Sequence, residues 1–523
     1  MQDRRQFLLG SLSTLGALTV PCRAQFGREN ETGINLVPAA PANSPSYWCT
    51  WSAQNYMYGR GTKEFDVRLL EGATGNRIAH DEINEELLLG PDGWSKKFFP
   101  AVREDLYLLI DDGWEEGGPA TFLLDEKKFP SFTGSPQERL RKLNEAIRAQ
   151  GWRGLALWCR DTSGGDADDR LVQWSEEAGV HYWKVDIGDS SFHLNQVRDR
   201  REAPLTIEHV HAEGPLNGDW QRDGRFGEQV WGSPRIEILR QTDIYRTYDT
   251  TAILSIPTTL DRVSMLLLGA QGHPEVRGIL NAEDEAYIAA VLGCTMGIMR
   301  HPLHGERPEG DPDLAFPGPR QQKRCMDEVV RALRWQRLAA PFPAGNGFIR
   351  LSKEILTDDW LFRPGETWFT ESIGQHVRQG APACISRNMD LPRVKCTGES
   401  PFVFTARFPN GAAALGTHER TSANLGFFRP KADVHWYLGN SPGPFGLFGY
   451  FESVTLKFDQ RVPKTRILAQ DLAADRALDI TRFVRIVGPE IFLPGQLLSH
   501  VGLSHATVGD LSAPASVVKL EAL

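Results

Sequence analysis

The chain has 523 residues, which is enough for two or three domains with sizeable cores. Hydrophobic residues make up 41% of it and charged residues 24%, proportions that are typical of a soluble globular protein. The formal net charge of −9 argues against nucleic acid as the main partner.

The first 24 residues predict a twin-arginine-type signal peptide. Arg4 and Arg5 precede Phe7 and a weakly apolar run through Val20, and Ala24 is a small residue suited to cleavage. The run is too short to span a membrane as a helix of the mature protein. We therefore expect export after folding, a periplasmic or secreted location, and no membrane span.

Strand-like and helix-like patterns alternate from about residue 46 to 340, as a βα-repeat architecture requires. In the clearest unit, Ser135 and Glu138 form a capping box that starts an amphipathic helix. A buried strand over 154–158 follows this helix. Later in the region, the pattern predicts a helix from Asn281 to about Met299.

The predicted secondary structure changes beyond about residue 345, where short β-rich runs replace the helical patterns. The turn 409–411 contains Asn-Gly and joins two such runs, which indicates a hairpin. We predict a C-terminal antiparallel β-sandwich in this part. Cys384 and Cys396 are the only close cysteine pair, and the sequence leaves a disulfide between them open. The predicted parts are a signal peptide (1–24), a βα-repeat region (25–345) and a β-domain (346–523).

Two strand-like runs end in acids. The apolar run that begins at Tyr107 ends in Asp111, Asp112 and Trp114, and a second run ends in Asp186. Unpaired buried charge is costly, but at the mouth of a parallel barrel acids can hold the hydroxyls of a ligand. The pattern therefore indicates an enzyme that binds and cleaves sugars. A simple turn and a strand-end salt bridge are the structural alternatives.

The motifs 48–51, 110–114 and 184–186, in this order, resemble glycoside hydrolase clan D. That clan holds families 27 and 36, the α-galactosidases and α-N-acetylgalactosaminidases, with plant raffinose-synthase-like relatives. The resemblance covers roughly residues 45–300. It implies an α/β fold class, a (β/α)8 TIM barrel followed by a C-terminal antiparallel β-domain, which agrees with the layout above.

The resemblance also implies catalytic roles. The Lys-x-Asp motif makes Asp186 the nucleophile, and Lys184 lies on the same face of the strand because side chains alternate with period two. Arg240 and Asp243 resemble the Arg and acid/base Asp of family 36, one residue closer together than in family 27. Asp249 is the alternative acid/base. A helix-start carboxylate is the structural reading of either aspartate.

Two expected motifs match less well. Glu213 stands where the family has Cys-Glu-Trp, but its neighbours here are Ala212 and Gly214. The segment 269–276 takes the place expected for the Asn-Asp-Pro-Asp-Met motif of family 27, which leaves the sugar specificity open. His211 is a pocket-lining candidate that shares a strand face with His209, although a buried, satisfied pair is an equal alternative. No third ligand follows at a convincing spacing, so we predict no zinc site.

Together these residues predict a retaining exo-acting α-glycosidase that hydrolyses terminal α-galactosyl or related sugars through a covalent glycosyl-enzyme, with no cofactor or metal. Its partner would be an oligosaccharide or glycoside, and the oligomeric state stays open. Other clan-D specificities (α-N-acetylgalactosaminide, β-L-arabinopyranoside, α-glucoside), transglycosylation, and a non-catalytic carbohydrate-binding protein on a degenerate barrel are the alternatives. The predicted substrate-binding residues are Trp51, Asp111, Asp112, Trp114, Trp158, Lys184, His211, Glu213 and Arg240.

Overall fold

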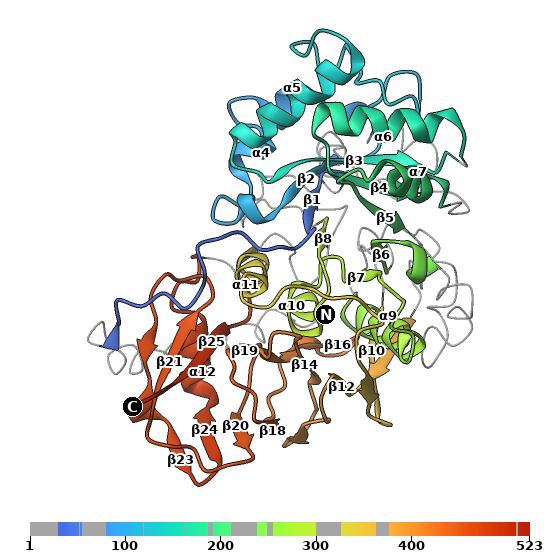
Figure 1. Cartoon of the computed structure of the whole chain (residues 1–523). Helices are drawn as coiled ribbons and strands as arrows, with labels where there is room; N and C mark the ends of the chain where they lie inside the picture. The colour runs from blue at the N-terminus through green and yellow to red at the C-terminus, as the bar shows by residue number, and fades with distance from the viewer. Residues whose placement is uncertain are drawn as a thin grey trace, which may run out of the picture.

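The computed structural model shows a parallel barrel next to a β-rich C-terminal region (Figure 1). The predicted signal peptide lies outside the described residues. Within the part of the chain that is described, no helix combines the length and the apolar character needed to cross a membrane. The described residues are 30–51, 53–54, 80–118, 120–162, 164–186, 192–210, 238–247, 255–299, 326–361, 376–508 and 511–523.

Eight parallel strands form the barrel, in the order β7-β6-β5-β4-β3-β2-β1-β8. A parallel bridge between Asn281 and Thr295, just ahead of β8, joins the two edges of the sheet. The barrel is therefore nearly closed. Its strands are β1 (Tyr47–Cys49), β2 (Tyr107–Ile110), β3 (Gly154–Arg160), β4 (Tyr182–Asp186), β5 (Thr206–Val210), β6 (Ile244–Arg246), β7 (Ile279–Asn281) and β8 (Gly297–Ile298).

Helices cover the outside of the barrel (Figure 1). The capping box predicted for α5 is confirmed, because the Ser135 hydroxyl accepts from the Glu138 N–H while the Glu138 carboxylate accepts from the Ser135 N–H. The elements of this layer are α3 (Glu85–Leu89), α4 (Trp94–Lys97), η3 (Arg103–Asp105), α5 (Pro136–Ala149), α6 (Asp166–Ala178), α7 (His193–Arg201), α9 (Ser255–Ala270), α10 (Ala286–Leu292) and α11 (Met326–Gln336).

The inside of the barrel is packed, and its lining changes along the strands. Tyr107 and Tyr182 at the strand starts belong to an apolar cluster inside the barrel. Because side chains alternate between the faces of a strand, Lys184 and Asp186 share the face of Tyr182, whereas Trp183 packs in the outer layer. The interior therefore becomes polar toward the carboxyl ends of the strands.

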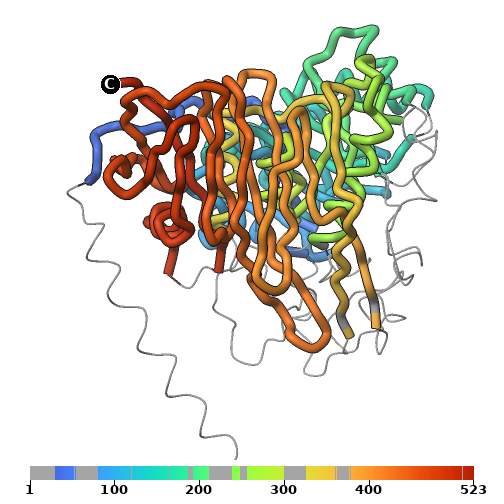
Figure 2. The backbone as a smooth tube through the Cα atoms, turned by 90° about the horizontal axis from the view of Figure 1, so that it is seen from below, coloured from blue at the N-terminus to red at the C-terminus, as the bar shows by residue number. Residues whose placement is uncertain are grey.

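The C-terminal region contains two larger sheets, whose strands run side by side in Figure 2. Their orders are β22-β21-β25-β19-β15-β14-β12-β9 and β13-β18-β20-β24-β23. The strands and helices here are β9 (Ile349–Leu351), β10 (Ile355–Leu361), β11 (His376–Pro382), β12 (Cys384–Arg387), β13 (Arg393–Lys395), β14 (Phe402–Arg407), β15 (Ala413–His418), β16 (Arg420–Ser422), β17 (Gly426–Phe428), β18 (Asp433–Gly439), β19 (Phe445–Phe448), β20 (Ser453–Phe458), β21 (Thr465–Asp471), β22 (Leu478–Asp479), η8 (Thr481–Phe483), β23 (Arg485–Val487), β24 (Glu490–Pro494), α12 (Gly495–Gly502) and β25 (Ala515–Ala522).

The predicted hairpin is present, since β14 and β15 pair antiparallel across the turn at Asn410 and Gly411. The sheets as a whole are mixed rather than antiparallel, because β12–β14, β15–β19 and β18–β20 pair in parallel. The reason is the path of the chain. Consecutive strands such as β18, β19 and β20 alternate between the two sheets, so a strand that returns to a sheet runs in its earlier direction. Cys384 and Cys396 are both free thiols.

Candidate functional site

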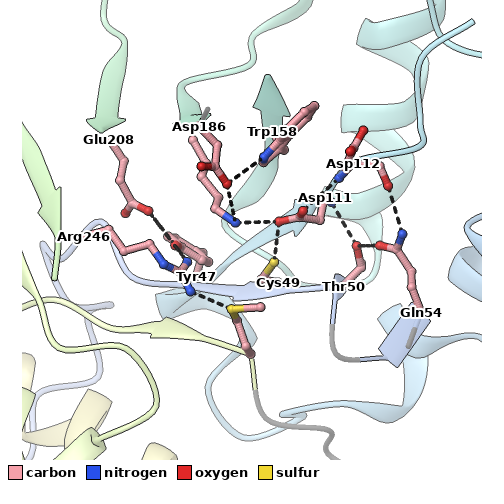
Figure 3. Close-up of polar contacts among 12 residues, drawn as sticks. Tyr47, Cys49, Thr50, Gln54, Asp111, Asp112, Trp158, Asp186, Glu208 and Arg246 are labelled. Atoms are coloured by element: carbon pink, nitrogen blue, oxygen red, sulfur yellow. Dashed lines mark hydrogen bonds and ion pairs between the residues drawn. The ribbon is translucent and has the colours of Figure 1, made fainter. Parts of the chain in front are cut away.

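A lysine and two aspartates meet at the carboxyl ends of β2 and β4 (Figure 3). The Lys184 Nζ lies 2.8 Å from Asp111 Oδ2 and 3.9 Å from Asp186 Oδ2. The side chains of Lys184 and Asp111 are 2% and 5% exposed, whereas that of Asp186 is 16% exposed. The cation is therefore buried against Asp111, and Asp186 is the more accessible carboxylate.

Asp111 is held by several donors at once. The Cys49 thiol donates to its Oδ2 at 2.9 Å, and the Asp112 N–H donates to its Oδ1 at 2.9 Å. Burial would raise the pKa of Asp111, but the Lys184 ammonium and these hydrogen bonds together hold that pKa below its usual range. Burial and the Asp111 charge raise the pKa of the Cys49 thiol well above its usual value, so Cys49 serves here as a neutral donor.

Asp186 is anchored from a neighbouring strand. The indole Nε1 of Trp158, on β3, donates to Asp186 Oδ2 at 3.2 Å, and the same oxygen faces Lys184 (Figure 3). A cation and an N–H donor both favour the ionised carboxylate. Trp158 is almost fully buried, so it orients Asp186 from inside the barrel.

The other predicted residues near this mouth differ in placement. Asp112 lies at the rim with its side chain 21% exposed, where it pairs with His80, and its carbonyl accepts from Gln54 Nε2 at 2.9 Å. Trp51 is half-buried and packs against the cluster inside the barrel.

Trp114 has a structural position behind the mouth. Its side chain is fully buried, its Nε1 donates to the Trp158 carbonyl at 2.9 Å, and its ring packs against Trp183 in the outer layer. A residue between the barrel and its helices cannot stack on a ligand in the mouth. The substrate contact predicted for Trp114 therefore does not fit this position.

Asp243 lies at the opposite end of the barrel from Asp186. It directly precedes β6, and its carboxylate pairs with Arg198 and accepts from the Ile207 N–H at 2.9 Å, near the start of β5. All eight strands run in the same direction, so Asp243 is at the amino ends whereas Asp186 is at the carboxyl ends. The structure does not bring the predicted catalytic pair together.

Arg240 is at the same amino end as Asp243. Its guanidinium lies 3.1 Å from the Glu275 carboxylate and 3.3 Å from His273 Nδ1, and both partners are in the turn before β7. Arg240 and Asp243 are both away from the mouth for the same reason. The motif 240–243 was expected at the carboxyl end of a strand, but β6 begins at Ile244, directly after this motif.

Three candidates lie outside the described residues and stay predictions. In the sequence, His211 and Glu213 follow the last residue of β5, and Asp249 follows the last residue of β6 by three positions. His209 is described and buried, but only one of its two ring nitrogens has a hydrogen-bond partner there, because Nδ1 has none among the described residues. Its Nε2 contacts Asn195 Oδ1 at 2.9 Å, and burial lowers its pKa to about 4.

A buried polar network beneath the mouth was missed by the sequence reasoning. Glu208, fully buried on β5, accepts from the hydroxyls of Tyr47 at 2.7 Å and Tyr182 at 2.6 Å, and from Asn281 Nδ2 at 2.9 Å. Arg246 donates to the Tyr47 hydroxyl (Figure 3). The only sequence signal was a single acid within the apolar strand 205–210.

Glu283 is a second carboxylate that sequence reasoning missed. It pairs with Arg246 and has a left-handed backbone conformation, with φ of 55°, which is uncommon for a non-glycine residue. Its N–H donates to Asn281 Oδ1 at 2.9 Å. Buried strain of this kind clusters at functional sites.

The segment 269–276, which was expected in the place of the Asn-Asp-Pro-Asp-Met motif, is not at the mouth of the barrel. The segment 269–276 lies at the end of α9 and in the turn before β7, at the amino end of the barrel. The carboxyl end of β7 instead reads Asn281-Ala282-Glu283-Asp284. Asn281 and Asp284 therefore lie toward the mouth, whereas the segment 269–276 does not.

Comparisons with protein-family models and with curated proteins found no match to this chain. Among the described residues, no group of three or more His, Cys, Asp or Glu side chains is arranged to hold a metal ion.

The mouth of the barrel therefore offers an anchored, partly exposed carboxylate, Asp186, beside a buried lysine, Lys184.

Proposed function

We propose that this protein is a glycoside hydrolase, a retaining exo-acting α-glycosidase that releases terminal α-galactosyl or related sugars. The barrel would be a (β/α)8 TIM barrel, with a β-sandwich formed by the two C-terminal sheets. The observation that carries the proposal is Asp186, a carboxylate oriented by Trp158 and Lys184 and more exposed than its neighbour Asp111. Active sites of such barrels form at the carboxyl ends of the strands.

In the first step, the Asp186 carboxylate attacks the anomeric carbon while an acid protonates the departing glycosidic oxygen. A glycosyl ester of Asp186 forms, and water then hydrolyses it with the same acid acting as base. Trp158 and Lys184 hold the Asp186 carboxylate in position before the attack. Asp112, the more exposed of the paired acids, would accept hydrogen bonds from hydroxyls of the sugar beside its contact with His80.

The acid/base has to come from the mouth that holds Asp186, because a retaining pair is separated by only about 5–5.5 Å. Asp243 is at the other end of the barrel, so the role passes to the alternative, Asp249, which follows β6 in the sequence. From the signal peptide predicted at 1–24, we propose twin-arginine export and a periplasmic or secreted enzyme of carbohydrate metabolism.

The test is the release of p-nitrophenol from a panel of α-glycosides by four proteins. Asp186→Asn and Asp249→Asn should each lower kcat by at least ~100-fold, the usual scale for loss of a catalytic group. Asp243→Asn is the matched control, and it should keep kcat within a few-fold of the parent once folding is verified by circular dichroism. Full activity of Asp186→Asn would refute the proposal.

A non-catalytic carbohydrate-binding protein is the second candidate, and the position of Asp243 favours it because the pair expected from the motifs is absent from the mouth. Binding of sugars without hydrolysis across the panel and natural oligosaccharides would support this candidate. The panel also separates α-galactosides from α-N-acetylgalactosaminides and α-glucosides. A p-nitrophenyl β-L-arabinopyranoside is tested beside it, and product analysis detects transglycosylation.

A further inference from the structure

The outer face of the five-stranded C-terminal sheet carries polar side chains in register. Residues that share this face alternate with buried ones, as in β18, where Val434 and Trp436 are buried and His435 is exposed. Cross-strand pairing aligns His435 with Thr455 on β20, Thr455 with Phe492 on β24, and Phe492 with Arg485 on β23. One row of side chains therefore crosses the sheet.

The central strand of this face forms the floor of a trough. Ser453 and Thr455 on β20 are each only 6% exposed although they lie on the outer face. Larger side chains on the neighbouring strands, including His435 and Phe492, rise on both sides of them. The resulting cavity has a volume of about 350 Å³, within the range of small-ligand sites.

The charges that line the trough cancel. Lys395 and Arg485 supply two positive charges, and Asp433 and Glu490 supply two negative charges. The Arg485 guanidinium lies 5.3 Å from the centre of the Phe492 ring, and Asp433 accepts from the Ser453 hydroxyl. A charged ligand gains little from such a balanced set. A neutral ligand that both donates and accepts hydrogen bonds can use all of it.

We propose that this trough is a second carbohydrate site, which binds a segment of a neutral polysaccharide. Sugar hydroxyls would bond to the carboxylates, the guanidinium and the floor hydroxyls, and the apolar face of a ring would pack on Phe492. Choosing carbohydrate among hydroxyl-rich ligands rests on the proposed function. The site itself is remote from the mouth, because Figure 1 places β18, β20, β23 and β24 at the end of the molecule away from β2–β4.

The test uses affinity gel electrophoresis of the full chain in gels that contain a neutral galactomannan, a neutral xyloglucan or anionic polygalacturonate. At least one neutral gel should retard the parent, and Phe492→Ala and Glu490→Gln should each weaken that association by about 5-fold or more. Lys519→Ala, an exposed change on β25 of the other sheet, is the control and should bind like the parent. Thermal unfolding checks that each variant is folded.

Binding and hydrolysis are read separately. The trough variants should hydrolyse p-nitrophenyl glycosides at the parent rate, because these small substrates need only the barrel. Retardation that depends on the trough, in a protein that cleaves no glycoside, would leave this inference standing while the proposed function fails. The inference is overturned if no neutral gel retards the parent or if both trough variants are retarded like the parent. It is also overturned if the polygalacturonate gel retards the parent more strongly than either neutral gel does.

Discussion

Lys184 contacts one of its two neighbouring carboxylates closely and the other at a longer distance. It contacts Asp111 at 2.8 Å and Asp186 at 3.9 Å, and both Lys184 and Asp111 are almost fully buried. Removing one partner of a buried ion pair leaves an uncompensated charge, which is far more costly than loss of a surface pair. Lys184 and Asp111 therefore fix β4 to β2 at the mouth, and Asp186 is the more accessible of the two carboxylates.

Glu115, next to Trp114, supplies a pH dependence that can be measured. Burial raises its pKa from 4.5 to about 7, although the N–H groups of Phe122 and Ala120 donate to it. Because the folded pKa is the higher one, its contribution to stability is full below about pH 4.5 and is lost as the pH rises through about 7. Glu115→Gln should therefore show a smaller fall in Tm between pH 5 and pH 8 than the parent.

Differential scanning fluorimetry across that pH window checks the Glu115 prediction. Glu116→Gln is the matched control, since Glu116 is the next residue and is exposed. It should keep the pH dependence of the parent. Equal slopes for Glu115→Gln and the parent would contradict the assignment of this titration to Glu115.

At the scale of elements, the sequence predicted those with strong local signals. The helix α5 begins at its capping box, β2 ends directly before Asp111, β4 ends at Asp186, and β14 and β15 pair across the Asn-Gly turn. The helix predicted from Asn281 to Met299 was wrong. The structure has the end of β7, the short helix α10 and the strand β8 there, because short buried elements share one apolar pattern and periodicity cannot separate them.

Only the part of the site that lies on one strand with a clear local pattern was predictable from the sequence. Lys184 and Asp186 lie two residues apart on a strand with a clear pattern, so their shared face followed from period two. Asp243 was misplaced because β6 has only three residues, too few to show where the strand starts. Glu208 and Glu283 were missed because their partners, Tyr47 and Arg246, are distant in the sequence.

The contact between α11 and β21 joins the barrel region to the C-terminal sheets. Arg331 on α11 makes a bidentate pair with Asp471 on β21, at 2.8 and 3.1 Å, and both side chains are fully buried. Arg331→Met leaves Asp471 buried without its cation and should destabilise the protein by about 3–5 kcal/mol. The loss should appear as a clearly lower Tm, and Arg331→Met/Asp471→Asn should recover part of it.

Arg466→Met is the control for this contact, because the Arg466–Asp479 pair is about one-third exposed on both sides. A surface pair contributes at most about 1 kcal/mol, so this variant should unfold close to the parent temperature. If Arg331→Met costs no more than Arg466→Met, the buried pair does not stabilise the junction.

At the scale of the whole molecule, the two regions share a core. One apolar cluster includes Trp183 and Tyr287 of the barrel region together with Phe404 and Phe448 of the C-terminal sheets. The ring centres of Tyr287 and Phe448 are 5.1 Å apart. The layout of a barrel followed by a β-region was visible in the sequence, but this shared core and the mixed pairing of the sheets depend on long-range contacts that local patterns do not encode.

The most direct test of the central claim, that Asp186 at the barrel mouth is the nucleophile, is covalent labelling. The protein is incubated with a slowly reacting fluorinated α-galactosyl fluoride, whose leaving group needs no acid, and its peptides are analysed by mass spectrometry. We predict one glycosyl group on the peptide that contains Asp186 and none on the same peptide of Asp186→Asn. A glycosyl group on a different residue of the parent would contradict the claim.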